Sequence, residues 1–316
     1  MIVGEHPLKD LYRQVVWGPG RALLERLPAP LELGVVRGGG RVAARALARR
    51  RGALVENLRR AFPERDPKDL DEIAARAFEA HVANQYISFS FEKCNADTWP
   101  RYLAFEGLKG LQEAWAAGRG VVLTHPHMGP AQLPLHVLGV LGWPMHQIGG
   151  GRVTAVELSP AGRAAAETRS RLERRMPVTL HDGRRFLRPA LRALEEGGVL
   201  MTACDATGGG EELGRRIPRR VLGQPMPIPV GPVWMAYKSG APLLTIHTRR
   251  GEPRGPRWVA EIGPEIVIRR DRGREAALSD GVDGIARYLD ACLRRYPGDW
   301  LFWDAFRPGG LLEPGP

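Results

Sequence analysis

Residues 121–130 read Val-Val-Leu-Thr-His-Pro-His-Met-Gly-Pro, an apolar run that changes abruptly into a loop of proline, histidine and glycine. A short apolar run that contains β-branched residues and ends in turn residues is typical of a buried strand in a parallel sheet. The apolar residues that follow Pro130 continue for the length of a helix. The stretch therefore predicts a strand, a loop that carries two histidines, and a helix.

Similar apolar runs recur toward the C-terminus and alternate with longer segments of helical pattern. Such alternation is the sequence pattern of an α/β fold. We therefore expect an α/β fold with a central, mostly parallel sheet flanked by helices. The predicted strands are 120–124, 145–148, 177–180, 198–203, 242–248 and 257–262, and the predicted helices are 130–141, 159–175, 184–196, 231–239 and 280–295.

The N-terminal third of the chain has a helical pattern instead. Apolar side chains recur at helical spacing between Ala43 and Phe62, and a turn bounded by prolines separates this run from a second helix. Residues 1–100 are therefore expected to form a helical section, and residues 101–316 to form the α/β core in one compact unit. The arginines between positions 41 and 60 form either a solvated face or an anion-binding face, and the pattern leaves both open.

The charge of the chain points toward an acidic partner. Lys and Arg number 46 against 35 Asp and Glu, which gives a net charge of +11, and most of the cations are arginines. The planar guanidinium binds phosphate and carboxylate groups in a bidentate manner. Nucleic acid, an anionic membrane or an acidic carrier protein would fit, although the base composition of the genome is an alternative reason for the preference for arginine.

The cysteines and the apolar segments narrow the class of protein further. Cys94, Cys204 and Cys292 lie far apart and outside any CxxC spacing, so we expect a reducing compartment and neither a disulfide framework nor a zinc site. Residues 121–151 carry no charge, but their prolines and histidines do not suit a membrane-spanning helix. Residues 11–36 are apolar but interrupted by arginines, which favours a segment that lies on a membrane surface. No secretory signal is expected.

Candidate site residues lie directly after two of the predicted strands. His125 and His127 follow the strand at 120–124, and Asp205 follows the strand at 198–203, just before a run of three glycines. Ligands gather at the carboxyl ends of strands in open α/β sheets. A histidine can remove a proton from a hydroxyl there, as O-acyl or phosphoryl transfer requires. The same residues also fit plain loop roles, in which they bond backbone groups or cap a turn.

A second candidate feature is basic. Four arginines lie within residues 215–220, and Leu222 and Gly223 follow them. The pattern is typical either of an anion cradle or of a solvated loop, and by itself it does not separate the two.

Taken in order, short motifs along the chain resemble the bacterial lipid A late acyltransferases. This lauroyl and myristoyl transferase family, within the lysophospholipid acyltransferase-like superfamily, also includes the phosphatidylinositol mannoside acyltransferases. The resemblance covers residues 40–308 and rests on five pieces that follow the family's order. They are Arg51 with Asn57-Leu58 and Ala61-Phe62-Pro63; residues 121–124 with His127; Asp205; Leu222-Gly223 with Pro229-Val230-Gly231-Pro232 and Gly240-Ala241-Pro242; and Tyr296-Pro297-Gly298-Asp299-Trp300.

The resemblance implies a glycerol-phosphate acyltransferase-like fold and an O-acyltransferase activity. His127 stands at the position of the family's general base, whose motif continues with four residues and then an acid. Gln132 occupies the position of that acid, and its carbonyl is expected to orient His127 without supplying a charge. Asp205 is expected to lie near the site, where it could supply the missing charge. Substrate contacts are expected from His125, Gly129, Arg219, Arg220 and Gly223, with the two arginines attracting phosphates.

The resemblance also implies partners and a location. The donor would be acyl carrier protein or acyl-coenzyme A, and the acceptor a hydroxyl of a lipid or glycolipid. The acyl thioester is a co-substrate, and no cofactor, metal or nucleic acid is expected. The protein would lie peripherally on an anionic membrane surface, at the cytoplasmic face of the inner membrane. Because Gln132 replaces the acid, a catalytically inactive member of the same fold that binds lipid or carrier protein is the alternative.

Overall fold

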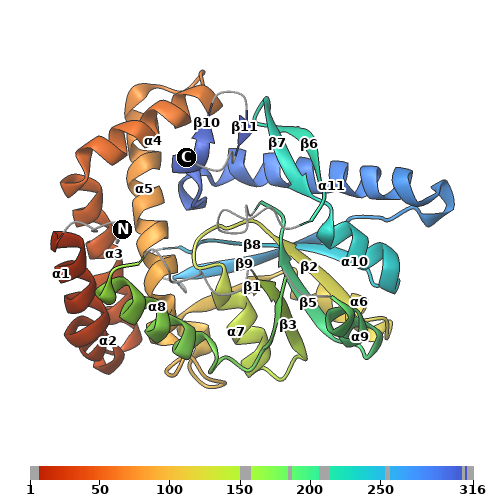
Figure 1. Ribbon diagram of the computed structural model, residues 1–316, viewed down its shortest axis with the longest axis horizontal. Coiled ribbons are helices and arrows are strands. Elements are labelled where there is room, and N and C mark those ends of the chain that lie inside the picture. The colour runs from red at the N-terminus through yellow and green to blue at the C-terminus, as the bar shows by residue number, and fades with distance from the viewer. Residues whose placement is uncertain are drawn as a thin grey trace.

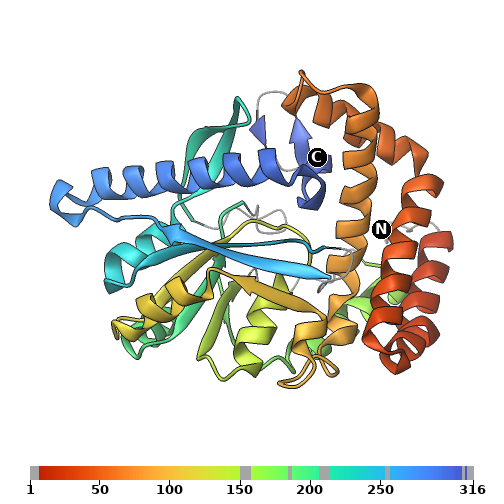
Figure 2. The same ribbon diagram turned by 180° about the vertical axis from the view of Figure 1, so that it is seen from behind.

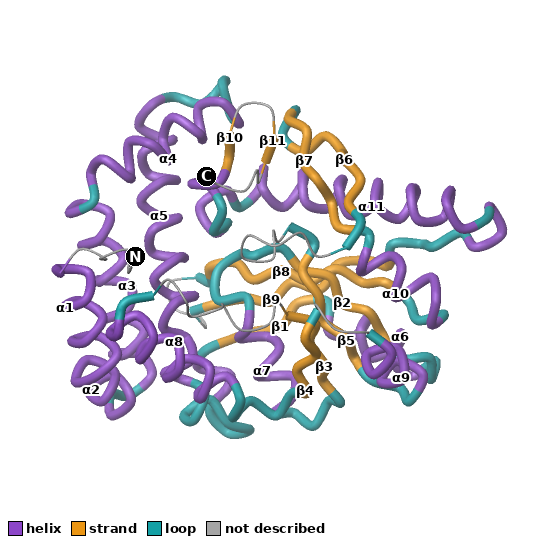
Figure 3. The backbone as a smooth tube through the Cα atoms, viewed as in Figure 1, coloured by secondary structure: helices purple, strands orange, loops and turns teal. Residues whose placement is uncertain are grey.

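The computed structural model describes residues 7–149, 158–183, 187–205, 214–252, 257–307 and 310–311. Helices of the N-terminal section stand along one side of a central sheet, and one long C-terminal helix crosses above it (Figure 1). The tube view separates these helical and strand regions (Figure 3). The expected α/β architecture with a helical N-terminal section is therefore confirmed.

Seven strands form the central sheet, in the order β1-β9-β8-β2-β5-β3-β4. The five strands from β8 to β4 run parallel to one another. Strand β9 runs antiparallel to β8 and parallel to β1, so the sheet is mixed but mostly parallel, as predicted. The strands are β1 (Leu103–Glu106), β2 (Val121–His125), β3 (Met145–Gly149), β4 (Thr179–Asp182), β5 (Val199–Ala203), β8 (Leu243–Arg250) and β9 (Trp258–Glu265).

Helices cover both faces of this sheet. Alternate residues of β2 point to opposite faces, so Val122 packs in one hydrophobic cluster while Val121 and Leu123 pack in another. The first cluster includes side chains of α9 (Arg188–Glu195), α10 (Gly231–Ser239) and α11 (Arg274–Arg295). The second includes α6 (Leu108–Ala116) and α7 (Gln132–Val140). The sheet is thus buried on both faces, which explains why its strands read as continuous apolar runs.

The N-terminal section forms its own layer of helices, which Figure 2 shows from behind, beside the ends of β8 and β9. It consists of α1 (Pro7–Val15), a five-residue π-helix (Val16–Gly20), α2 (Arg21–Arg26), α3 (Ala29–Ala46), α4 (Ala48–Ala61) and α5 (Pro67–Tyr86). A later helix, α8 (Pro160–Glu173), joins this layer through a hydrogen bond from Ser159 to Asp10. None of the helices in the described residues combines the length and the apolar character needed to cross a bilayer.

A two-stranded hairpin, β6 (Arg216–Val221) and β7 (Gln224–Pro229), lies outside the sheet and packs against α11. The sequence did not predict it. Its turn holds Leu222 at φ 52° and Gly223 at φ 74°, the left-handed backbone that two-residue hairpin turns require. Two shorter strands, β10 (Phe306–Arg307) and β11 (Gly310–Leu311), pair near the C-terminus.

Candidate active site

The register of the sheet brings His127 and Asp205 to the same place. Strands β2 and β5 are parallel neighbours, with His125 opposite Ala203. His127 and Asp205 each lie two residues beyond that pair. Their side chains therefore emerge side by side at the carboxyl edge of the sheet, where ligands of open α/β folds bind.

A hydrogen bond joins these two side chains. The Nδ1 atom of His127 lies 2.7 Å from Oδ1 of Asp205. The other carboxylate oxygen, Oδ2, accepts from the backbone N–H of His127 at 2.8 Å and from Nε1 of Trp300 at 2.8 Å. An ionised carboxylate only accepts, so the proton lies on Nδ1 and leaves the lone pair on Nε2. His127 thus has the tautomer that a general base needs.

Asp205 is completely buried, yet its surroundings keep it charged. Burial by itself would raise the pKa of this carboxyl. The charge of the facing imidazole and the hydrogen bonds from His127 and Trp300 outweigh burial and hold the pKa below its usual value. A buried anion is in turn well placed to stabilise an imidazolium on His127.

A short C-terminal segment fixes the loop that carries His127. The backbone N–H of Gly129 donates to the carbonyl of Asp299 at 2.7 Å, and the N–H of Leu301 donates to the carbonyl of His127 at 3.0 Å. Met128 and Trp300 form an antiparallel bridge between these bonds. Residues 299–301 therefore act as a short strand that holds the histidine loop while Trp300 holds Asp205.

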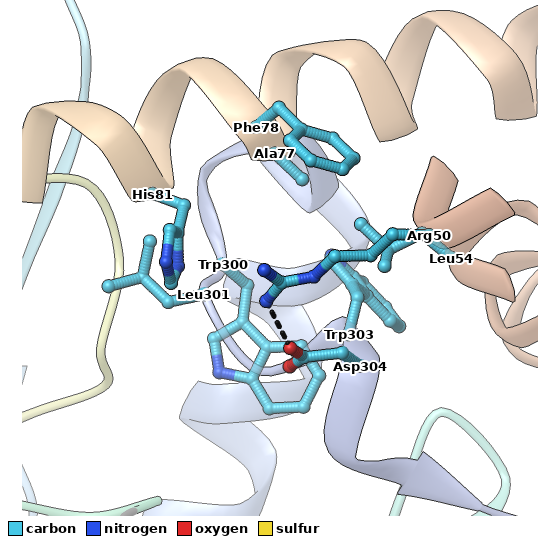
Figure 4. A pocket seen from close by; sticks show the side chains of 9 residues that line it. All are labelled: Arg50, Leu54, Ala77, Phe78, His81, Trp300, Leu301, Trp303 and Asp304. Atoms are coloured by element: carbon cyan, nitrogen blue, oxygen red, sulfur yellow. Dashed lines mark hydrogen bonds and ion pairs between the residues drawn. The ribbon is translucent and has the colours of Figure 1, made fainter. Parts of the chain in front are cut away.

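Packing behind Trp300 supports this segment (Figure 4). The cavity that remains there measures about 20 Å³, room for about one water molecule, so it is too small for a substrate. Trp300 and Trp303 meet edge to face, with ring centroids 4.8 Å apart. Asn57 donates to the carbonyl of Trp303 at 2.7 Å, and Phe62 packs on the same indole at 5.8 Å. Asn57 and Phe62, from the first of the family motifs, thus support the two tryptophans near the C-terminus.

A larger cavity of about 390 Å³ opens beside His127, within the range of small-molecule pockets. His125 and His127 line it together with apolar side chains from four elements or their neighbouring loops. These are Ile148, Leu187, Val230, Trp234, Met235 and Leu278. Arg215, Arg216 and Arg274 also line it. The cavity therefore combines a base, an apolar wall and positive charge.

Comparison of the sequence with known proteins identifies the family of the chain. The family model for bacterial lipid A biosynthesis acyltransferase matches residues 18–303. The chain belongs to this acyltransferase family. A phosphatidylinositol mannoside acyltransferase of Mycolicibacterium smegmatis is 26% identical over 305 residues, which cover 94% of this chain and 92% of that protein. The family resemblance predicted from the ordered motifs is therefore confirmed.

The position of the family's motif acid differs from the expectation. Gln132 begins α7, and its Oε1 atom is buried without a hydrogen-bond partner in the described part of the chain. The orienting hydrogen bond expected from Gln132 is thus not formed. Asp205 makes that contact instead, because the strand register places it directly beside the imidazole.

His125 differs sharply from His127 although only one residue separates them. It is buried, and its Nδ1 atom lies 3.2 Å from the carbonyl of Pro126. Burial, aided by the neighbouring His127, lowers the pKa of His125 to about 4. It lines the cavity as a neutral group, and no carboxylate in the described part of the chain bonds it.

The other expected substrate contacts lie away from the cavity. Arg219 is bound to Asp283 and Ser279 of α11, and Arg220 donates to the carbonyl of Gly223 at the hairpin turn. The cavity lining includes none of the expected residues Arg219, Arg220 and Gly223. The hairpin carries them away from the sheet edge, whereas Arg215 and Arg216 at its base reach the cavity.

Gly129 has a conformational role in the backbone of the histidine loop. It has φ 51°, and a Cβ atom there would lie 3.0 Å from the ring of Trp258 and 3.2 Å from the carbonyl of Thr248. Only glycine fits this approach without strain.

Three residues at the site have no catalytic or substrate-binding role assigned to them from the sequence. Trp300 bonds Asp205, Phe302 lies with its ring centroid 4.8 Å from that of His127, and Arg274 lines the cavity. The closing motif with Trp300 was the available signal for the first of them.

Among the described residues, no three His, Cys, Asp or Glu side chains gather as a metal site. The glycines expected after Asp205 lie outside the described residues.

Proposed function

We propose that this protein transfers an acyl chain from a thioester to a hydroxyl of a lipid or glycolipid, with His127 as general base. The observation that supports it best is the contact of His127 with the buried Asp205 at the wall of a cavity. A base beside a buried carboxylate resembles the arrangement of hydrolytic triads, here without a protein nucleophile. The acceptor hydroxyl takes the place of that nucleophile.

The reaction follows from the positions of the protons. Nε2 of His127 removes the hydroxyl proton while the acceptor oxygen attacks the thioester carbonyl carbon. Asp205 stabilises the imidazolium that forms. When the tetrahedral intermediate collapses, the C–S bond breaks, and the imidazolium returns its proton to the leaving thiolate. The products are an ester and a free thiol.

The cavity beside His127 suits an acyl thioester. Its apolar wall would take the acyl chain, and Arg215, Arg216 and Arg274 would attract the phosphates of coenzyme A or of an acyl carrier protein. No step in this reaction needs a metal or a redox cofactor. The relative from Mycolicibacterium smegmatis, named for phosphatidylinositol mannoside, supports a glycolipid acceptor for this chain.

Contact with a membrane surface supports the same proposal. Eight large apolar residues are exposed on the N-terminal helices and their junctions: Leu11, Tyr12, Val15, Leu23, Leu31, Val35, Val42 and Leu47. Arginines interrupt this surface, and the combination suits peripheral binding to an anionic leaflet at the cytoplasmic face of the inner membrane.

An acyl-transfer assay tests the proposed function. Purified protein is incubated with acyl carrier protein or coenzyme A thioesters and a bacterial lipid extract, and acylated products are found by mass spectrometry. The His127→Ala variant should lose activity by at least about a hundredfold, because it removes the general base. The matched variant His125→Gln should remain active, since among the described residues the His125 side chain bonds only the backbone carbonyl of Pro126.

The alternative function predicts a different result. A wild-type protein that binds the acyl thioester but forms no ester with any lipid would contradict the enzyme and favour the inactive binding protein. Activity lost in His125→Gln and kept in His127→Ala would show that the wrong histidine has been chosen.

A further inference from the structure

Four arginines gather around a single buried glutamate at the junction of the N-terminal helices and the sheet. Glu79 of α5 accepts from Nε of Arg37 at 3.0 Å and from Nε of Arg41 at 3.0 Å. It also accepts from Arg250, at the end of β8. Arg257, at the start of β9, is the fourth cation of this group. We call these four arginines and Glu79 the arginine cluster.

Close packing of two helices builds the cluster. A Cβ atom on Gly40 would lie 2.6 Å from Cα of Glu79, so only glycine allows α3 and α5 to approach this closely. The approach places Glu79 between Arg37 and Arg41, which lie one helical turn apart. Figures 1 and 2 show α3 and α5 side by side, and Figure 2 shows the ends of β8 and β9 extending toward α5.

The cluster has more positive charge than its acid can neutralise. Four guanidinium groups face one carboxylate, and three of them already bond it. Arg257 forms no ion pair in the part of the chain that the structure describes. Burial and repulsion from Arg37 and Arg250 lower the pKa of Arg257. A surplus of cations that are partly removed from water is costly unless an anion joins them.

Asp299 is a second acid beside the cluster, and even when it is ionised four guanidinium groups face only two carboxylates. Asp299 accepts from the backbone N–H of Arg250 at 3.1 Å, but burial raises the pKa of Asp299 against the lowering effect of Arg250. The Nη2 atom of Arg250 is buried and has no hydrogen-bond partner among the described residues. The cluster thus offers unused donors as well as unbalanced charge.

We propose that the arginine cluster is a second anion site, in which Arg37, Arg41, Arg250 and Arg257 bind a phosphate group. A phosphate oxygen accepts several charge-assisted hydrogen bonds, and guanidinium groups present donors in the matching fork. The site is separate from the cavity at His127, since none of its residues lines that cavity. It lies at the same carboxyl edge of the sheet, because Arg250 and Gly129 both bond Asp299.

Two binding measurements test the site and separate its two possible phosphate sources. Calorimetric titration with inorganic phosphate, at fixed ionic strength in chloride, reports a free phosphate. Sedimentation with phosphatidylcholine vesicles, with and without phosphatidic acid, reports a lipid headgroup. No acyl donor is present, so the outcome does not depend on the proposed transfer reaction.

Matched arginine variants identify the residues responsible. Arg257→Gln breaks no ion pair with another described residue and should fold normally, and Arg41→Gln removes a second contact while Glu79 keeps two partners. Arg272→Gln is the control, because Arg272 is 53% exposed, as Arg41 is, and pairs with one carboxylate, Asp280. Each cluster variant should weaken phosphate binding about tenfold, the loss of one charged hydrogen bond, and the control should not.

The outcomes decide the proposal. Tighter binding by wild type in both experiments supports a site for free phosphate, and tighter binding to phosphatidic acid vesicles alone supports a lipid headgroup site. Absence of wild-type binding in both experiments overturns the proposal. So does an equal loss in Arg272→Gln, which would reflect net charge only, or unchanged binding in both cluster variants.

Discussion

Two histidines separated by one residue have opposite surroundings in this protein. Both line the cavity, but His127 bonds a buried carboxylate, whereas His125 is buried with its Nδ1 atom against a backbone carbonyl. The pKa of His125 falls to about 4 because burial disfavours its charged form. This difference in burial gives the two side chains different chemistry and gives His125 an effect on stability.

The lowered pKa of His125 predicts sensitivity to acid. The unfolded chain binds a proton at this residue below about pH 6.5, while the folded chain does so only below about pH 4. The unfolded state therefore binds more protons between these values, and the free energy of unfolding should fall as the pH falls through this window. His125 would contribute up to about 3 kcal/mol to that fall.

Urea unfolding at several pH values measures this effect. In His125→Gln the amide can donate to the same carbonyl but does not titrate, so the free energy of unfolding should fall less between pH 6.5 and pH 4. The same pH dependence in wild type and variant would mean that His125 is not held neutral by the fold.

The sequence pointed to each half of the proposed catalytic pair but not to their contact. His127 and Asp205 were both recognisable, since each follows an apolar strand. Their contact depends on β2 and β5 being neighbours in register, which no local pattern reveals. The motif spacing pointed to Gln132 as the partner of His127. Spacing along the chain gives a distance in sequence, and it does not show which side chain faces the imidazole.

At the scale of elements, the histidine loop depends on a segment about 170 residues further along the chain. Residues 299–301 bond the loop on both sides, and Trp300 reaches Asp205. The segment therefore fixes the positions of both residues of the proposed catalytic pair, and the proposed reaction uses no atom of the segment itself. Trp300 is a positioning residue.

Trp300→Phe tests this role. The change keeps an aromatic ring but removes the Nε1 donor to Asp205, so kcat should fall about tenfold, as expected for the loss of a hydrogen bond to a charged group. The KM for the acyl donor should stay near its wild-type value, since Trp300 does not line the cavity. Steady-state kinetics separates the two effects.

Trp303→Phe is the matched control. Trp303 is buried like Trp300, but its Nε1 donates to the carbonyl of Pro297, away from Asp205. The two variants should lose similar stability, and only Trp300→Phe should lose kcat. Equal losses of kcat in both would show that the segment acts through stability alone.

Strands were predictable from the sequence where they lie in a sheet that is buried on both faces. All six predicted strands exist, with ends displaced by three residues or fewer, because a sheet covered on both faces selects apolar runs. Strand β1 was not predicted from the sequence. The β6–β7 hairpin was missed because its arginines and prolines resemble a loop, and an isolated hairpin tolerates them.

At the scale of the whole molecule, the helical N-terminal section carries most of the exposed large apolar residues. Its apolar segments interrupted by arginine were visible in the sequence, and the structure places them on the outside of the helical layer (Figure 1). The proposed membrane contact therefore belongs to this layer and is separate from the loops that hold His127 and Asp205.

Binding to vesicles tests the membrane contact. Wild-type protein should sediment with anionic vesicles and be released by salt, which screens exposed charges within about 8 Å at physiological ionic strength. Leu31→Asp should weaken this binding, because it places a charge on an apolar side chain that is 59% exposed. An aspartate in the first turn of α3 also suits the helix dipole, so the fold should persist.

Val267→Asp provides the control at a distant surface. Val267 is 66% exposed and follows β9, outside the N-terminal section. Its substitution should leave vesicle binding unchanged. Equal binding by Leu31→Asp and wild type, or protein that stays on vesicles in high salt until detergent is added, would contradict peripheral binding by this layer.

The central claim is that Asp205, and not Gln132, serves His127, and the turnover rate of two single variants tests it most directly. Asp205→Asn keeps the shape but removes the charge and permits the wrong imidazole tautomer, so kcat should fall about a thousandfold or more, as in other carboxylate–histidine pairs. Gln132→Ala should change kcat by only a few fold, since its Oε1 bonds nothing in the described residues. With both variants folded, a large loss in Gln132→Ala together with near-normal turnover in Asp205→Asn would contradict this account.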